Sequence, residues 1–374
     1  MQREGGILTR SQRLAWLRLI RTDNVGPVTF RQLLNRFGSA EAALEALPSL
    51  VRQAGVGARL CSPGEAEAEL EATEQMGARL IALGEPDYPP LLKYISGAPP
   101  VLAVAGGDEL DWGKSVAMVG ARNASAAGQK MTRMLAQDLG AAGYTIVSGL
   151  ARGIDSAAHR ASLATGTVAV LAGGLDHIYP DENVPLAREI VEHGGALVTE
   201  MPLNWEPRAR DFPRRNRLIS GLSLGVVVVE AAKRSGSLIT ARLALEQNRD
   251  VFAVPGSPLD PRAEGANSLI QQGAKLVTGA ADVLESLATA DPTRTSLLEA
   301  DWEPDYGETG ITPDLPSADE RGRLLEALSV TPMPVDELLA DTGLSVPALQ
   351  TLLIELDLAG RLEWSAGQLV ALRG

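Results

Sequence analysis

The sequence contains few cysteine, histidine and aromatic residues. Among 374 residues there is one cysteine, Cys61, and there are three histidines, His159, His177 and His193. A single cysteine cannot form an intramolecular disulfide or a thiolate metal cluster, and such usage is typical of a reducing compartment. The histidines are not spaced as a zinc site requires. We therefore expect a cytoplasmic protein that uses no catalytic metal or other cofactor.

Long apolar runs and an excess of positive charge are also missing. The longest uncharged aliphatic run, LGVVVV, ends before Glu230, far short of the roughly 20 residues that span a bilayer. The first residues show no apolar core of a secretory signal, so we expect a protein without a membrane segment. The formal net charge of -13 argues against binding of polyanions over the whole surface. Any nucleic-acid site must therefore be local.

The charges are unevenly distributed along the chain. Residues 299–320 carry only acidic charges together with several prolines and glycines, which is the composition of a solvated linker. By contrast, residues 208–217, RARDFPRRNR, contain five arginines and one carboxylate, that of Asp211. Residues 1–36 hold seven arginines against Glu4 and Asp23. Two basic islands therefore stand on an acidic background.

Short β-branched runs alternate with helical patterns in the middle of the chain. The runs are VAMVG, YTIVSG, TVAVLAG, ALVTE, GVVVVE, DVFAVPG and AKLVTG. Runs that are apolar on both faces indicate parallel strands joined by crossover helices. We predict an α/β protein with a Rossmann-like, doubly wound, mostly parallel sheet over residues 76–290. A helical domain is expected over 1–75, an acidic linker over 291–318 and a further domain over 319–374.

In doubly wound sheets, ligands bind beyond the carboxyl ends of the strands. The loops at these ends are GARNAS, SGLARGIDS, AGGLDHIYP, TEMPLNWEPRARDFPRRNR, EAAKRSGSLIT and PGSPLDPRAEGANS. Each joins glycine or serine to a helix start, where backbone amides can meet an anion. Several add a basic side chain, namely Arg122, Arg152, Arg214, Arg215, Arg217, Lys233 and Arg234. So many anion sites along one rim favour a strand of phosphates over a mononucleotide.

Individual residues sharpen this prediction of a single-stranded nucleic-acid site. Arg122 stands where a dinucleotide fingerprint would place glycine. Gly236 allows close approach of a phosphate, and Ser235 or Ser237 can cap the following helix. Base stacking needs aromatic rings, and these form only 4% of the chain. Phe212 is the first candidate and Trp205 the second.

Six blocks of the sequence resemble the DNA-processing protein A (DprA/Smf) family. They are VGARNAS, SGLARGIDSAAHRASL, GGLDHIYP, DFPRRNRLISGLS, VVVVEAAKRSGSLITARLALEQNRDVFAVPG and GANSLIQQGAKLV. The resemblance covers about 200 residues in the right order. It implies a non-enzymatic protein that binds single-stranded DNA without strong sequence preference. It also implies a homodimer that protects the strand and helps to load RecA recombinase during natural transformation.

The resemblance also implies a set of DNA-binding residues. They are Gly120, Arg122, Ser148, Gly149, Arg152, Gly153, Phe212, Arg214, Asn216, Arg217, Ser235, Gly236 and Ser237, with Lys233 and Arg249 as flanking charges. We include Arg210 and Arg215 from the arginine cluster. After HIYP some relatives place a lysine, whereas this chain has Asp181 and Glu182. Dimerisation and the RecA contact are expected near residues 241–254 and 267–275.

Several of these residues also have structural interpretations. Arg122 could pair with Asp155, and Phe212 could belong to the core. Asn216 and Arg217 could brace loops. Asp155 and His159 lie four residues apart on an expected helix, which fits an acid–base pair or, as we favour, structural capping.

The terminal regions suggest two further domains. The N-terminal helices are interrupted by DNVGPVTF and QAGVGARL, which are consistent with the helix-hairpin-helix or SAM-like domain that the family carries. Pro27 removes one amide donor from the first hairpin. Residues 319–374 show three helices and a hairpin, the order of a winged helix. Its third helix has Glu355 and Asp357 but no Lys or Arg between Ser345 and Gly360, so we predict a protein-contact or autoregulatory role.

Two other classes of protein remain open. One is a nucleotide-dependent Rossmann enzyme, either an NAD dehydrogenase or a lysine-decarboxylase-like hydrolase. No GxGxxG with a following ribose-binding acid is present, and PGSPLDP replaces the PGGxGT loop of the hydrolases. The other is a scaffold whose loops hold only an ordering anion.

Overall fold

The computed structural model describes residues 6–55, 57–288, 316–365 and 369–373. Contacts divide the chain into two compact units. The central unit comprises residues 71–98 and 102–300, with 1–5, and the flanking unit comprises 6–70, 99–101 and 301–374. Most of the predicted acidic linker, residues 291–315, lies outside the described residues.

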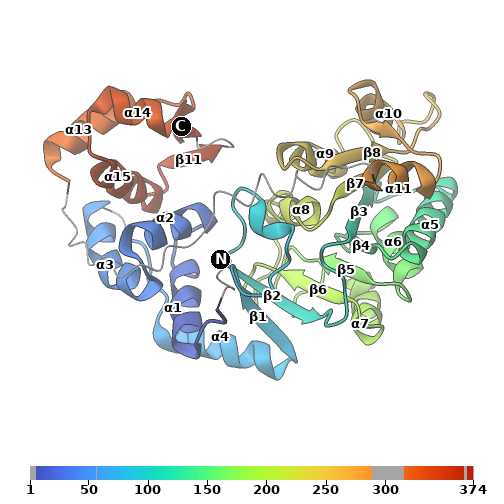
Figure 1. Ribbon diagram of the computed structural model, residues 1–374, viewed down its shortest axis with the longest axis horizontal. Helices are drawn as coiled ribbons and strands as arrows, with labels where there is room; N and C mark the ends of the chain where they lie inside the picture. Colours follow the sequence, from blue (N-terminus) through green and yellow to red (C-terminus); the bar gives the residue numbers. More distant parts are fainter. Residues whose placement is uncertain (1–5, 56, 289–315, 366–368, 374) are drawn as a thin grey trace. The chain divides into compact units, whose positions relative to one another are not determined.

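The central unit is built on a nine-stranded sheet with the order β1-β2-β6-β5-β4-β3-β7-β8-β9 (Figure 1). All pairs from β6 to β9 are parallel, while β2 runs antiparallel to β6. This confirms the predicted mostly parallel, doubly wound sheet. The strands are β1 (Ala78–Ala82), β2 (Val101–Gly106), β3 (Ser115–Gly120), β4 (Thr145–Ser148), β5 (Thr167–Val170), β6 (Ala196–Thr199), β7 (Gly225–Val229), β8 (Asp250–Ala253) and β9 (Lys275–Leu276).

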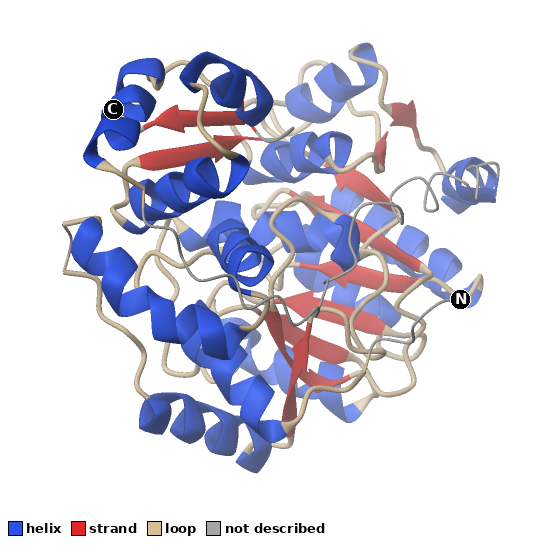
Figure 2. Cartoon of the chain, turned by 60° about the vertical axis from the view of Figure 1, so that its left-hand side comes forward, coloured by secondary structure: helices blue, strands red, loops and turns tan. Residues whose placement is uncertain are grey.

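Helices connect these strands and lie in front of and behind them (Figure 2). The helices are α5 (Ala126–Ala141), α6 (Ile154–Ser162), α7 (Val184–Glu192), α8 (Asp211–Gly221), α9 (Gly236–Glu246), α10 (Glu264–Gln271) and α11 (Ala280–Ala288), with 3-10 turns η1 (Leu92–Tyr94) and η2 (Asp181–Asn183). The order β5-β4-β3-β7-β8 reverses direction between β3 and β7. Such a switch point is where doubly wound sheets bind ligands.

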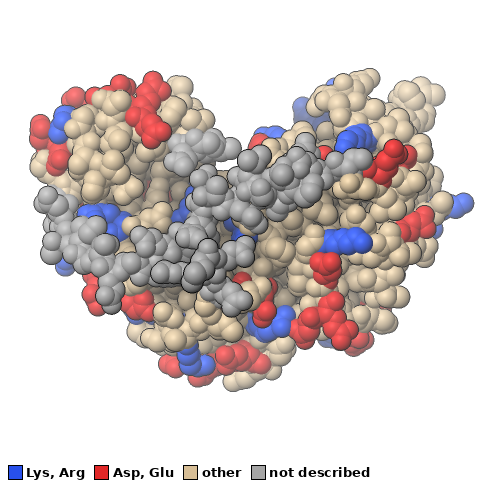
Figure 3. All heavy atoms as spheres, in the orientation of Figure 1, with Lys and Arg blue, Asp and Glu red and all other residues tan. Residues whose placement is uncertain are grey.

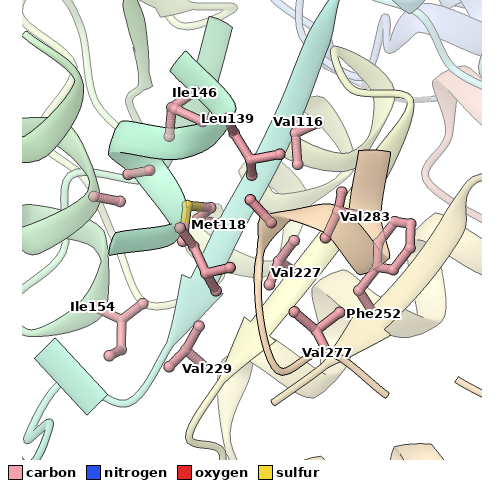
Figure 4. Packing of buried hydrophobic residues seen from close by; sticks show 14 residues of the cluster. Val116, Met118, Leu139, Ile146, Ile154, Val227, Val229, Phe252, Val277 and Val283 are labelled. Carbon is pink, nitrogen blue, oxygen red and sulfur yellow. The ribbon is translucent and has the colours of Figure 1, made fainter. Parts of the chain in front are cut away.

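Strand residues of alternating register form the core of the central unit. Val116 and Met118 of β3 pack with Val227 of β7 and Phe252 of β8, and helices α5, α6 and α11 cover them (Figure 4). The intervening residues, such as Ala117, are buried as well, so both faces of the sheet are covered. The β-branched runs therefore form the central strands. In a sheet that is covered on both faces, every side chain of such a strand is buried, so a continuous apolar run fits there.

The flanking unit contains the N-terminal helices and the winged helix. The N-terminal helices are α1 (Arg10–Ile20), α2 (Pro27–Phe37), α3 (Ala40–Gln53) and α4 (Pro63–Gln75), whose last residues, 71–75, belong to the central unit. The winged helix comprises α13 (Ala318–Ala327), β10 (Met333–Pro334), α14 (Val335–Thr342), α15 (Val346–Leu358), β11 (Leu362–Ser365) and β12 (Leu369–Leu372). Its strands pair antiparallel in the order β10-β12-β11. The predicted helices and hairpin are confirmed. In the described part of the chain, no helix has the length and hydropathy needed to cross a bilayer.

Candidate nucleic-acid interface

A pocket opens at the carboxyl edge of the central sheet. It is lined by loops after β3, β4 and β5 and by the first turns of α8. The lining residues are Arg122, Gly149, Ala151, Arg152, Tyr179, Pro180, Phe212 and Arg215. Three guanidinium groups and two aromatic rings thus meet at one concavity, although the residues lie up to 93 positions apart in the chain. Five of the predicted DNA-binding residues lie here.

Arg122 is an exposed cation of this pocket. It follows β3 directly, and its guanidinium carbon lies 5.8 Å from the centroid of the Phe212 ring. Among the described residues no carboxylate pairs with it. In particular, Asp155 accepts hydrogen bonds instead from the amides of Gly149, at 3.1 Å, and Ala151, at 3.3 Å. Arg122 is therefore available to an anionic ligand.

Arg215 supports the pocket from beneath. Its side chain is only 6% exposed and donates hydrogen bonds to the carbonyl oxygens of Gly149, at 2.7 Å, and Val170. Burial lowers the pKa of Arg215 to about 10, and the nearby Asp155 carboxylate opposes that shift. The group therefore stays charged at neutral pH. Because it is enclosed, we reinterpret Arg215 as a positioning residue rather than a phosphate contact.

Two aromatic rings form one wall of the pocket. Tyr179 and Phe212 meet edge to face, with ring centroids 5.4 Å apart and an interplanar angle of 67°. Tyr179 is 51% exposed, which leaves a face for a base. Sequence analysis missed Tyr179, although HIYP lies in a strand-end loop where an exposed ring is informative. Trp205 instead donates to Asp211 at 3.0 Å and lies under Arg208.

Most other predicted basic residues pair with carboxylates. Arg152 donates to Glu182 at 2.8 Å, and Lys233 lies 3.3 Å from Glu264. Arg214, at 3.2 Å, and Arg217 both pair with Glu200. Figure 3 accordingly shows acidic side chains beside basic ones on the central unit. The ion pairs of Arg152 and Lys233 are exposed, so they contribute little stability and can exchange a carboxylate for a phosphate. The side chains of Arg217 and Glu200 are only 14% and 7% exposed, which favours the bracing role for Arg217.

The start of α9 forms a second, open part of the rim. Ser235 is the N-cap, and its hydroxyl accepts from the Ser237 amide at 3.3 Å. Asn216 donates to the Gly236 carbonyl at 3.4 Å and so links α8 to this turn. No atom lies within 4 Å of a Cβ added at Gly236. This turn is therefore built for close approach from solvent.

Other predicted contacts prove to be internal. Ser148 is fully buried and donates to the Met118 carbonyl at 2.6 Å, and Arg249 is buried and donates to the Leu91 carbonyl at 2.8 Å. A Cβ at Gly120 would collide with the Val229 carbonyl. In this structure these residues maintain the fold, and only backbone atoms of Gly120 remain as possible ligand contacts. Arg210, at the start of α8, is exposed.

The pair Asp155 and His159 is structural. Asp155 caps the loop after β4, as described above, and His159 contacts the Thr167 hydroxyl at 2.7 Å. Burial lowers the pKa of His159 to about 3, so its imidazole is neutral and enclosed. The capping interpretation fits this geometry, because neither group faces solvent.

The first strand-to-helix turn carries its own carboxylate. Glu230, after β7, accepts from the Ser125 amide at 2.9 Å and from the Ser125 hydroxyl. A Cβ at Gly128 would lie 2.6 Å from a Glu230 oxygen. The sequence predicted free amides in every loop, and this one is an exception because Glu230 fills the anion site at the start of α5. Next to β3, the positive charge that a phosphate would need is therefore that of Arg122 and not that of free loop amides.

Gly236→Ala tests whether a ligand approaches the α9 turn. The added methyl group meets open space, and Ala is favoured over Gly in a helix by about 0.5–1 kcal/mol, so the free energy of unfolding should stay the same or rise. If a phosphate lies against this backbone, the affinity for an oligothymidylate should nevertheless fall. Fluorescence anisotropy and urea unfolding measure the two effects. Unchanged affinity would remove Gly236 from the site.

The fold and pocket together define a class of protein. A Rossmann-like sheet has a cationic, aromatic pocket at the carboxyl ends of its strands, and the chain adds a helical domain with two hairpins and a winged helix. This combination is that of a DNA-processing protein.

Comparisons with known proteins identify the family. Residues 79–288 match the family "DNA recombination-mediator protein A", residues 10–72 its N-terminal HHH domain, and residues 312–368 its winged-helix domain. The chain is 42% identical to protein Smf of Escherichia coli over 82% of this chain and 81% of that one. It is 47% identical to DprA of Bacillus subtilis over 58% and 74%. The chain therefore belongs to the DprA/Smf family.

Two solved structures agree with this assignment. DprA from Streptococcus pneumoniae aligns with a TM-score of 0.58 and 34% identity, covering 75% of this chain and 98% of that one. DprA from Helicobacter pylori aligns with a TM-score of 0.52 and 28% identity, covering 56% and 95%. The latter protein is described as binding single-stranded DNA in a unique mode.

Proposed function

We propose that this chain binds single-stranded DNA at the pocket of Arg122, Phe212 and Tyr179 and along the rim to Gly236. The observation that carries the proposal is the exposed Arg122 guanidinium beside two rings at the carboxyl ends of β3, β4 and β5. A cation for the phosphate and a ring for the base are what single-strand recognition requires. Binding should be largely independent of sequence, because phosphate contacts carry no base information.

The proposal extends to the biological role that family membership suggests. The bound strand is protected and passed to RecA recombinase, during transformation or recombination in the cytoplasm, by a homodimer that catalyses no reaction itself. The surfaces for dimerisation and RecA are expected on α9, β8, α10 and β9. Sedimentation of the full chain, and RecA filament assembly on protein-bound DNA, test these two parts separately from DNA binding.

The competing function is that of a nucleotide-binding Rossmann enzyme. Its phosphates would bind at the start of α5, where Glu230 already accepts from Ser125. The Glu230 carboxylate would repel a phosphate bound there, and the repulsion would weaken binding of the nucleotide. Mononucleotides should therefore compete poorly against a labelled oligothymidylate. Strong competition would favour the enzyme.

Arg122→Ala should weaken binding of single-stranded DNA whatever its sequence. Removal of one phosphate contact should reduce the slope of log affinity against log salt by about 0.7. Anisotropy titrations of a labelled oligothymidylate at several salt concentrations measure this slope. Arg208→Ala is a suitable control, because Arg208 lies over Trp205 outside the pocket. If a folded Arg122 variant keeps the wild-type slope, Arg122 makes no phosphate contact.

Phe212→Ala should cost roughly 1–3 kcal/mol of DNA-binding free energy if a base stacks on the ring. Tyr179→Ala should show a smaller or similar loss, and the double variant should lose less than the sum, because the rings share one edge-to-face contact. Anisotropy with oligothymidylate measures all three. Wild-type affinity of a folded Phe212→Ala protein would make the ring part of the packing only.

A further inference from the structure

The third helix of the winged helix, α15, is buried on two sides. Its inner stripe, Leu349, Leu352, Leu353 and Leu356, belongs to the core of the winged helix. A second stripe, Thr351, Ile354, Glu355 and Leu358, has the same spacing and is at most 2% exposed. A helix with two buried stripes needs two packing partners. The winged-helix core provides only one of them.

Helix α2 of the N-terminal domain provides contacts for the second stripe and its edge. Arg36 donates to the Thr351 hydroxyl at 3.3 Å, and Thr29 donates to the Asp357 carboxylate. Asn24, in the hairpin between α1 and α2, donates to the Leu358 carbonyl at 2.7 Å. Three separate positions, from the hairpin to the last turn of α2, thus contact the last two turns of α15.

The two helices also complement each other in charge. Helix α2 carries Arg31 and Arg36 and no acidic residue, whereas α15 carries Glu355 and Asp357 and no basic residue. An acidic helix therefore lies against a basic one. Glu355 itself pairs with Arg321 of α13, and Asp357 contacts α2 through Thr29. A DNA-reading helix needs cations. Contact with the basic helix α2 gives a reason why α15 has none.

We infer that the winged helix is a protein-docking domain whose partner is the first hairpin and α2 of the N-terminal domain of the same chain, and that docking holds Arg36, which is 6% exposed, and the second half of α15 away from DNA. The hairpin meant here is residues 22–27. Its Asn24 is engaged by Leu358, and α2 engages Thr351 and Asp357 of α15. The second half of α15 is thereby covered, whereas Gln350 in its first half and Asp23 and Asn24 in the hairpin stay exposed.

Cross-linking tests the docking. In a Cys61→Ala background, Asn24→Cys and Ala359→Cys place thiols beside the Asn24–Leu358 hydrogen bond. A short bis-maleimide with a reducible disulfide should link them rapidly within one chain. The control pairs Asn24→Cys with Ala340→Cys, because Ala340 is exposed on α14, and it should react much more slowly. Links that form only between two chains, or at the control rate, would overturn the docking.

DNA binding tests the consequence of docking. We compare the cross-linked protein with the same sample after reduction of the linker, using a short duplex and an oligothymidylate. Release should strengthen duplex binding and steepen its salt slope by about 0.9 for each phosphate that the freed surface meets. Oligothymidylate binding at the central pocket should not change, so a failure of the proposed function would be seen separately. Equal duplex affinity before and after reduction would refute the shielding of Arg36 and α15.

Discussion

Arg215→Ala is expected to lower the free energy of unfolding by about 3–5 kcal/mol, the usual cost of removing one member of a buried charged network. The substitution leaves the carbonyls of Gly149 and Val170 without their donor, and it leaves the buried Asp155 without its nearest positive charge. Urea unfolding of the full chain, followed by circular dichroism, measures the loss. DNA affinity should fall with it, because the floor of the pocket collapses.

Two neighbouring variants make the Arg215 experiment specific. Arg214→Ala removes a guanidinium that is 48% exposed, and it should cost no more than about 1 kcal/mol. Arg215→Lys keeps the charge but not the forked donor geometry, so its stability should lie between wild type and Arg215→Ala. A loss under about 1 kcal/mol for Arg215→Ala would contradict the positioning role.

Gly153→Ala is expected to combine backbone strain with displacement of the Arg122 loop. Gly153 has a φ of 74°, a conformation that costs a residue with a Cβ about 1–3 kcal/mol. The new methyl group would also collide with the Ala121 carbonyl and lie 2.6 Å from the Arg122 carbonyl oxygen. The Arg122 loop must move to relieve this contact. Affinity for oligothymidylate should therefore fall at least as far as in Arg122→Ala.

Gly194→Ala separates the two effects. Gly194 has a φ of 80°, and no atom lies within 4 Å of an added Cβ. It should therefore show the backbone cost alone and retain wild-type DNA affinity. Unfolding and anisotropy measurements on both variants give the difference that belongs to the collision. If Gly153→Ala behaves like Gly194→Ala in both assays, the packing of the Arg122 loop against Gly153 does not affect DNA affinity.

The sequence predicted the strand-end loops but not the state of their charges. GARNAS and KRSGSLIT have equivalent patterns of small residues before a helix, yet the first is filled by Glu230 and the second is open at Gly236. The carboxylate that distinguishes them lies 105 residues from Ser125. A pattern that covers a few neighbouring residues cannot show that Glu230 and Ser125 meet. Tyr179 was missed for a similar reason. Its ring becomes a candidate for base stacking only beside the ring of Phe212, which lies on α8, a distant segment of the chain.

The sequence by itself determined the architecture: a mostly parallel sheet, preceded in the chain by a helical domain and followed by a winged helix, with a candidate ligand rim at the strand ends. Periodicity, β-branching and glycine position act over a few residues, so they can be read locally. Tertiary structure alone decided which arginines face solvent and which, like Arg215, are enclosed. It also placed Asn24 against Leu358, 334 residues away. The reason is that the energy of a charge or polar group depends on the partners and solvent around it, and folding brings these together from distant segments.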